Sequence, residues 1–204
     1  MSTQPIEQTV QGYSYQRPKK TTSDSEFSLD AEQSKTRRVD TPASGSVMRG
    51  YLRDLLATAA PDGGSTLSFS DVEAHHADLL ESWNSEVKAD LTDLGVDTDS
   101  VFRLMHDPAG TATVVGDHPD KEMINAYFTS NPDKVTELGR TLQFGKLVAT
   151  AKNRLSEKDM DRSLSTDAMA WWYSTNMDTA SLFSPGGVVV GASATPYKGL
   201  DIRV

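Results

Sequence analysis

The amino-acid sequence predicts an α+β fold that is mainly helical, with four or five helices, one β-hairpin and a short C-terminal strand. Three observations lead to this prediction. Apolar residues recur with a helical period in several long segments. Residues 101–116 read as two short strands around a Pro-Ala-Gly turn, and residues 188–190 are a run of valines. The 204 residues suffice for a tail and one domain of ordinary size, so we assign residues 47–204 to a single globular α+β domain.

Residues 1–46 form a polar segment that is rich in Ser, Thr, Gln, Pro and charged side chains. The segment carries six Lys/Arg and six Asp/Glu, and its few large apolar residues follow no sustained period. Such a chain cannot offset its ordering entropy by burying apolar surface. We therefore expect an arm that is disordered alone or becomes ordered on a partner.

Two helices are expected next. Apolar residues at helical spacing indicate a helix over residues 47–60, which Pro61 and the following glycines end. A longer helix is expected over residues 70–94, because Ser70 and Glu73 have the spacing of a capping box and Gly95 suits a left-handed C-terminal cap. Its apolar stripe would consist of Val72, His76, Leu79, Leu80, Trp83, Val87, Leu91 and Leu94.

The hairpin follows an acidic turn. Phe102, Leu104 and His106 alternate with their neighbours, and Gly110 supplies the positive φ that the turn needs. A lone hairpin is marginal in water, so these strands must pack on the helices.

Pro119 suits the first turn of the next helix. The apolar face of that helix would consist of Met123, Ile124, Tyr127 and Phe128.

The remaining elements are two helices and one or two strands. Asn131-Pro132 predicts the start of a helix that runs to about Leu155. Gly139 and Gly145 weaken it by roughly 1 kcal/mol each unless they allow close packing. A short aromatic helix is expected over residues 166–177, a strand over 188–190 and a possible strand over 200–204.

Charge is unevenly distributed in this chain, whose net charge is -9. Residues 71–133 carry three basic and fourteen acidic side chains, whereas residues 134–162 carry seven basic and four acidic ones. The acidic region argues against sequence-blind DNA binding, so we expect no nucleic-acid partner. Lys134, Arg140 and Lys146 give a basic helix surface. It would either anchor to the acidic helices or contact an acidic partner.

Trp171, Trp172 and Tyr173 are consecutive, so on a helix they span about 200°. One core face cannot bury all three side chains. Either at least one is exposed or lies at an interface, where Trp and Tyr are enriched, or a small C-terminal core encloses them. Both interpretations stay open, and we take the three residues as candidate interaction residues.

The sequence contains little that indicates chemistry. It has no cysteine, which excludes disulfides, thiolate metal sites and thiol catalysis. No cofactor motif is present, so we expect no cofactor.

Asp71, His75 and Asp78 share one helix stripe and are the candidate ligands for Zn²⁺ or Mn²⁺, although a solvated helix face explains them as well. His106 and His118 would lie at opposite ends of a strand, and His118 is expected to form a hydrogen bond near the next helix start.

Neither a spanning apolar segment nor a cleavable signal peptide is visible. We therefore expect no membrane insertion. The protein would be cytoplasmic or exported without a cleavable signal.

Asp107-Pro-Ala-Gly110, Val114-Val-Gly-Asp-His-Pro-Asp-Lys121 and Asn131-Pro132 together resemble a segment of uncharacterised proteobacterial proteins. In that pattern a short hairpin precedes Gly-x-His-Pro-Asp-Lys, a helix and an Asn/Asp-Pro restart. The resemblance covers residues 90–150. It implies a bacterial origin and carries no known activity, so it transfers no functional residue.

These features predict a non-enzymatic bacterial interaction or assembly protein, such as a component of a surface appendage or a virion-like assembly. Its N-terminal arm would bind neighbours, either copies of itself or another assembly subunit. One alternative is a secreted effector or export substrate with an unfolded N-terminal signal. Another alternative is a metal-dependent hydrolase that uses Asp71, His75 and Asp78.

Overall fold

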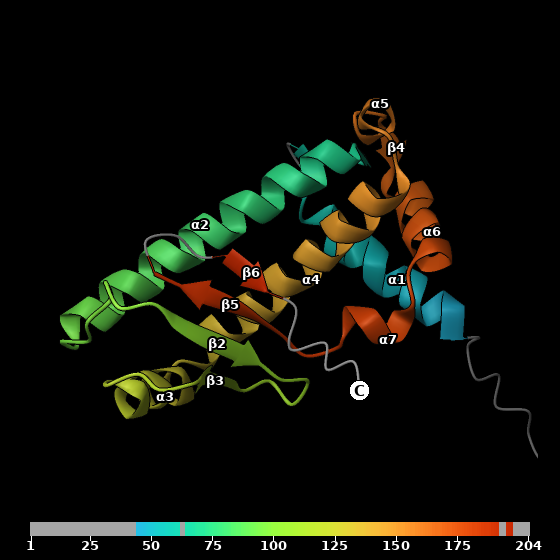
Figure 1. Ribbon diagram of the computed structural model, residues 1–204. Helices are drawn as coiled ribbons and strands as arrows, with labels where there is room; N and C mark the ends of the chain where they lie inside the picture. The colour runs from blue at the N-terminus through green and yellow to red at the C-terminus, as the bar shows by residue number, and fades with distance from the viewer. Residues whose placement is uncertain (1–43, 62–63, 192–194, 198–204) are drawn as a thin grey trace, which may run out of the picture. The chain divides into compact units, whose positions relative to one another are not determined.

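Seven helices and six strands are formed by the residues that the computed structural model describes, which are 44–61, 64–191 and 195–197 (Figure 1). The helices are α1 (Ser44–Ala57), α2 (Phe69–Asp93), α3 (Lys121–Ser130), α4 (Pro132–Arg154), α5 (Glu157–Met160), α6 (Thr166–Asn176) and α7 (Thr179–Leu182). The strands are β1 (Thr66–Leu67), β2 (Phe102–His106), β3 (Ala112–Val115), β4 (Leu164–Ser165), β5 (Gly186–Val190) and β6 (Thr195–Tyr197). The predicted α+β, mainly helical fold class is confirmed. Five helices are longer than the single turns α5 and α7.

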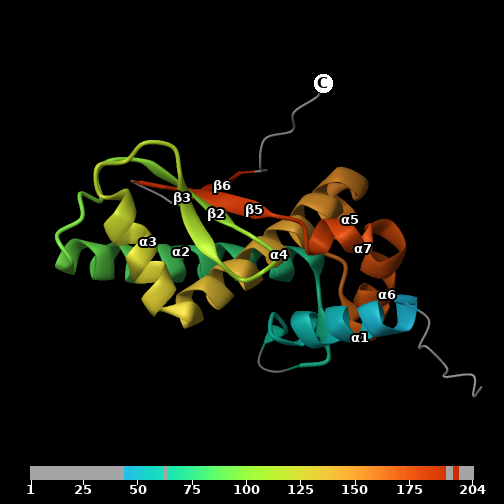
Figure 2. The same ribbon diagram turned by 90° about the horizontal axis from the view of Figure 1, so that it is seen from below.

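Two apolar cores share the long helices α2 and α4. In Figure 2, α1, α6 and α7 lie toward one end of these two helices, and α3 and the larger sheet lie toward the other. The first half of α2 and the second half of α4 pack with α1, α6 and α7 in one core. The second half of α2 and the first half of α4 pack with α3 and the larger sheet in the other. Leu52 of the first core and Leu138 of the second are completely buried. Each such leucine stabilises the fold by about 1.5–3 kcal/mol.

The larger sheet is antiparallel, with the strand order β3-β2-β5-β6. Leu104 of β2 lies between Val114 of β3 and Val188 of β5, and all three side chains are buried against the helices. The predicted hairpin and the predicted strand at 188–190 are therefore confirmed, and they pair directly with each other. Strand β6 and the two-stranded β1-β4 sheet were not predicted.

The capping box predicted at Ser70 and Glu73 is wrong, because helix α2 begins two residues earlier. Ser68 is the N-cap, with extended backbone. Its hydroxyl accepts from the Asp71 amide at 3.0 Å, and the Asp71 carboxylate accepts from the Ser68 amide at 2.7 Å. Phe69, the first helical residue, is buried in the first core. That burial favours the earlier of two capping patterns that both fit the sequence.

The predicted end of α2 is confirmed in detail. Gly95 has a φ of 84°, and its amide donates to the Thr92 carbonyl at 2.9 Å. The Val96 amide donates to the Leu91 carbonyl at 3.0 Å, which completes a Schellman motif. Leu94, which was predicted to belong to the apolar stripe, is instead exposed because it is the C-cap residue.

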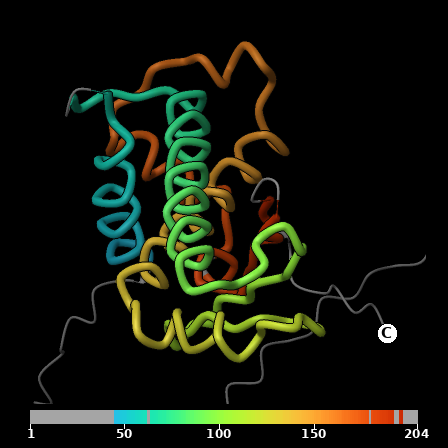
Figure 3. The backbone as a smooth tube through the Cα atoms, turned by 90° about the vertical axis from the view of Figure 1, so that its left-hand side faces the viewer, coloured from blue at the N-terminus to red at the C-terminus, as the bar shows by residue number. Residues whose placement is uncertain are grey.

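Helix α3 differs from the prediction at both Pro119 and Met123. Pro119 lies in the turn before the helix, whose first residue is Lys121. The turn is closed by His118, whose Nδ1 accepts from the Asp120 amide at 3.1 Å, as predicted for a hydrogen bond near the helix start. Met123 is exposed rather than part of the apolar face. Figure 3 shows α3 running across below the C-terminal end of α2.

Helix α3 also protects the edge of the sheet. The Asn125 side chain accepts from the Val114 amide at 2.8 Å, on the side of β3 that faces away from β2. An unpaired edge amide is a template for pairing with another chain. Asn125 therefore makes this edge less available for strand addition.

Both glycines of α4 allow another element to pack closely against the helix. This was one of the two possibilities that the sequence left open. A β-carbon at Gly139 would lie 2.9 Å from His106 Nε2, and one at Gly145 would lie 3.0 Å from His76 Nε2. The two histidines come from β2 and α2, so the glycines let two different elements approach the helix. The predicted start of α4 at Pro132 is confirmed.

The aromatic helix α6 places its three consecutive rings in different surroundings. Tyr173 is completely buried, Trp172 is half-buried against Phe69, and Trp171 is 54% exposed. One exposed ring agrees with the first of the two interpretations of this cluster.

We expect Tyr173→Phe to raise the free energy of unfolding by about 1 kcal/mol, because a buried hydroxyl without a partner carries a desolvation penalty. The Tyr173 hydroxyl is buried, and among the described residues it has no hydrogen-bond partner. Burial also raises its pKa. Tyr127→Phe is the matched control and should lower stability, since the Tyr127 hydroxyl donates to Asp90 at 2.6 Å. Urea unfolding of both variants measures the difference; a loss of stability in Tyr173→Phe would contradict this account.

Two expectations fall largely or entirely outside the described residues. They are the polar arm, of which residues 1–43 are not described, and the possible strand at 200–204. The described residues belong to one compact unit, Asp40–Val204. Within them, no helix combines the length and apolar character needed to cross a membrane.

Candidate interaction surface

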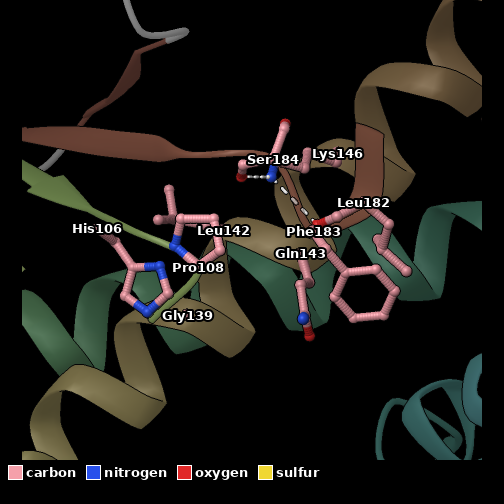
Figure 4. A pocket seen from close by; sticks show the side chains of 9 residues that line it. All are labelled: His106, Pro108, Gly139, Leu142, Gln143, Lys146, Leu182, Phe183 and Ser184. Atoms are coloured by element: carbon pink, nitrogen blue, oxygen red, sulfur yellow. Dashed lines mark hydrogen bonds between the residues drawn. The ribbon is translucent and has the colours of Figure 1, made fainter. Parts of the chain in front are cut away.

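A pocket lies where the hairpin turn, α4 and the connection between α7 and β5 meet (Figure 4). The pocket is partly open to solvent, and its empty space counted together with that open solvent is about 420 Å³. Its lining residues are His106, Pro108, Gly139, Leu142, Gln143, Lys146, Leu182, Phe183 and Ser184. They come from three segments far apart in the chain, so the pocket exists only in the folded protein.

Lys146 supplies a positive charge in this pocket. Its amine donates to the carbonyl of Leu182 at 3.1 Å and to the carbonyl of Ser184. These carbonyls lie at and just beyond the end of α7, so the lysine holds the connection that leads into β5. Burial lowers the pKa of Lys146 because the surrounding protein disfavours the charged form.

His106 contributes an imidazole at the end of β2, with its ring pointing toward Gly139 (Figure 4). Burial lowers the pKa of His106, with Asp107 opposing and Lys146 reinforcing that shift. The ring is therefore mainly neutral at pH 7, so one of its nitrogens can donate a hydrogen bond and the other can accept one. Together with Gln143 and Lys146, it gives the pocket polar groups among apolar walls.

An exposed aromatic pair lies beside the pocket. The rings of Tyr51 in α1 and Phe183 after α7 lie 5.2 Å apart between centroids. The Tyr51 hydroxyl donates to the Gln143 side chain at 2.7 Å, which ties the pair to the pocket lining. Val47 lies one turn before Tyr51 and is 58% exposed. We call Val47, Tyr51, Phe183 and the pocket residues the α1–α7 surface.

Only one of the predicted interaction residues, Lys146, lies in this surface. Lys134 bonds to Glu86 and, at 3.0 Å, to Glu137, so it anchors to acidic side chains of the same chain, as one interpretation predicted. These bonds raise the pKa of Lys134. Arg140 is exposed on α4. Trp171 is exposed on α6, whereas Trp172 and Tyr173 pack on Phe69.

Sequence reasoning missed Val47, Tyr51 and Phe183 as surface residues. Tyr51 fits the apolar pattern of α1 as well as its buried neighbour Leu52 does. Phe183 follows a single-turn helix that the sequence did not predict. No local signal distinguishes these exposed rings from core residues, because their exposure depends on how α1, α4 and α7 pack.

Two of the three candidate metal ligands have other roles in the structure. Asp71 closes the capping box with Ser68, and His75 packs edge-on against Phe144 at 4.8 Å between ring centroids. Across the described part of the chain, no group of three His, Asp or Glu side chains is placed to hold a metal ion. Asp71, His75 and Asp78 are therefore not brought together as a ligand set.

His106 and His118 are separated by the length of β2. His106 is the last residue of that strand, whereas His118 packs on Phe102, the first, with ring centroids 5.4 Å apart. The two imidazoles therefore belong to different surroundings, as predicted.

Comparison of this chain with protein-family models, curated proteins and solved structures finds no match. The resemblance of residues 90–150 to proteobacterial proteins therefore stays a prediction. An inference about function has to start from the surface described above.

Proposed function

We propose that this protein is a non-enzymatic assembly protein that binds neighbouring subunits through the α1–α7 surface. The observation that carries this proposal is the exposed Tyr51–Phe183 ring pair beside the pocket. Binding hot spots in protein interfaces are enriched in aromatic side chains that cluster at pockets. Phe183 is 44% exposed and Tyr51 37% exposed, so both rings would gain burial in a complex.

The polar groups of the surface suit this role. Tyr51, Gln143 and Lys146 are already connected to the fold by hydrogen bonds. A preorganised surface loses less side-chain entropy on association than a mobile one does.

A bacterial origin and a place in an appendage or virion-like particle remain part of the proposal, supported by the resemblance and the composition of the arm.

The test is the solution mass of the full-length chain, measured by light scattering over a range of protein concentrations and at low and high salt. We expect the wild type to form a species larger than the 22.2 kDa monomer. Phe183→Ser should shift it toward the monomer, because the exposed ring is lost while the buried core is kept. Leu94→Ser, which removes another exposed apolar side chain at the end of α2, is the matched control and should leave the mass unchanged.

Thermal unfolding of each variant verifies that it is folded. A wild type that remains a monomer at every concentration, or a Phe183→Ser variant that assembles like the wild type, would contradict the proposed function. Loss of assembly as salt rises would indicate that the acidic and basic regions contribute to association.

A further inference from the structure

The pocket of the α1–α7 surface has an electrostatic character unlike that of the chain as a whole. The protein carries 29 acidic and 20 basic residues, yet no carboxylate is among the described residues that line the pocket. Lys146 and His106 are its titratable groups. The neighbouring Asp107 accepts from the Thr111 amide at 2.9 Å and from the Thr111 hydroxyl at 2.7 Å, so it is engaged in the hairpin turn. The Asp107 charge still acts on His106, so the group of the pocket that can bind an anion is Lys146.

Lys146 can bind an anionic group directly. An ammonium has three N–H donors, and the carbonyls of Leu182 and Ser184 use two of them. The third donor can bind a carboxylate oxygen. A carboxylate would also favour the charged form of Lys146, which burial disfavours in the free protein.

The apolar walls of the pocket favour a ligand that carries an apolar group beside its anionic group. Leu142, Pro108 and Phe183 line it, and Tyr51 and Val47 extend the apolar surface along α1. The complementary ligand is an acidic peptide segment with an aromatic or aliphatic side chain next to its carboxylates.

The chain itself contains a segment of this chemistry. Residues 24–32 read Asp-Ser-Glu-Phe-Ser-Leu-Asp-Ala-Glu, with four acidic and no basic side chains. Phe27 and Leu29 lie among these carboxylates. The six basic residues of the first 46 positions all lie outside this segment, so its charge is locally unopposed along the chain.

We propose that the α1–α7 surface binds residues 24–32 of a neighbouring copy, with a carboxylate on Lys146 and Phe27 or Leu29 against Phe183. This inference rests on the proposed function and names its partner. Phe27 is seventeen residues before Ser44, a length of chain that can span roughly 56–61 Å when extended. That reach is sufficient to connect two subunits.

The first experiment measures peptide binding to a full-length receptor whose own segment carries Phe27→Ala and Leu29→Ala. A fluorescein-labelled peptide of residues 22–34 is the probe, and its anisotropy is the readout. Adding Phe183→Ser or Lys146→Met to the receptor should weaken binding at least about tenfold, as for the loss of an interface hot spot. Leu94→Ser should have no effect. A peptide with Glu26→Gln and Asp30→Asn should bind more weakly and with a smaller salt dependence.

The second experiment tests whether binding joins two copies. The arm variant (Phe27→Ala with Leu29→Ala) has an intact surface, and the surface variant (Phe183→Ser) has an intact arm. Each should be monomeric alone by light scattering, and an equimolar mixture should form a heterodimer that a mixture of two surface variants does not form.

The outcomes separate this inference from the proposed function. An arm variant that assembles like the wild type would overturn the inference, while a monomeric Phe183→Ser variant would still support assembly through this surface. Peptide binding without any heterodimer would overturn binding between copies. Equal affinity of the peptide for receptors with and without Phe183→Ser would overturn the assignment of the site.

Discussion

Replacing Trp83 by alanine is expected to lower the free energy of unfolding by about 3–5 kcal/mol, the largest effect of a single substitution that we predict. Trp83 is 2% exposed in the second core and stacks on Phe128, with ring centroids 6.1 Å apart. Its indole N–H donates to the Lys134 carbonyl at 2.9 Å. The substitution therefore leaves a cavity between α2, α3 and α4 and also removes a hydrogen bond between helices.

Two further variants divide this effect into its parts. Trp83→Phe keeps much of the volume and loses the hydrogen bond, so we expect a loss of about 1–2 kcal/mol. Trp171→Ala removes an exposed indole and should change stability by less than about 0.5 kcal/mol. Urea unfolding followed by circular dichroism measures all three. A Trp83→Ala variant as stable as Trp171→Ala would show that the second core is packed differently.

Gly145→Ala is expected to destabilise the protein by up to about 2 kcal/mol, although alanine is the better helix former. The helix gains roughly 1 kcal/mol from the substitution. Against this, the new methyl group would lie 3.0 Å from His76 Nε2, and overpacking of this kind costs about 1–3 kcal/mol. His76 Nε2 is buried between α2 and α4. We therefore expect the steric cost to exceed the helical gain.

The sign of the effect should reverse when His76 is removed. In a His76→Ala background, Gly145→Ala has no ring to displace and should stabilise the helix by up to about 1 kcal/mol. A double-mutant cycle on unfolding free energies measures this coupling. Additive effects of the two substitutions would show that His76 and Gly145 do not constrain each other.

Local signals in the sequence identified most of the elements. Gly95 and Gly110 predicted a helix end and a turn, because both need the positive φ that glycine adopts most readily. Pro132 predicted the start of α4, since its ring suits the first helical position. These signals work because they concern backbone groups within a few residues of each other.

The start of α2 shows where local signals become insufficient. Ser68 with Asp71 and Ser70 with Glu73 both have the spacing of a capping box. The burial of Phe69 beside Trp172 and Tyr173 decides between them. A choice between two adequate caps therefore depends on packing with a helix about a hundred residues further along the chain.

The candidate site could not be read from the sequence for the same reason. Lys146 was singled out for its charge, but Tyr51 and Phe183 were not, and Tyr51 bonds to a residue 92 positions away. Whether a ring in an apolar pattern is buried or exposed depends on which elements cover it.

The sequence by itself determined the fold class, the hairpin, the main helices and the uneven charge, because these follow from periodicity, turn residues and composition. Only the tertiary structure decided which aromatic side chains reach the surface, why α4 contains two glycines, and that Lys146 and His106 line one pocket. Each of these depends on contacts between residues distant in the chain, which are set by the packing of α2 and α4 with their neighbours.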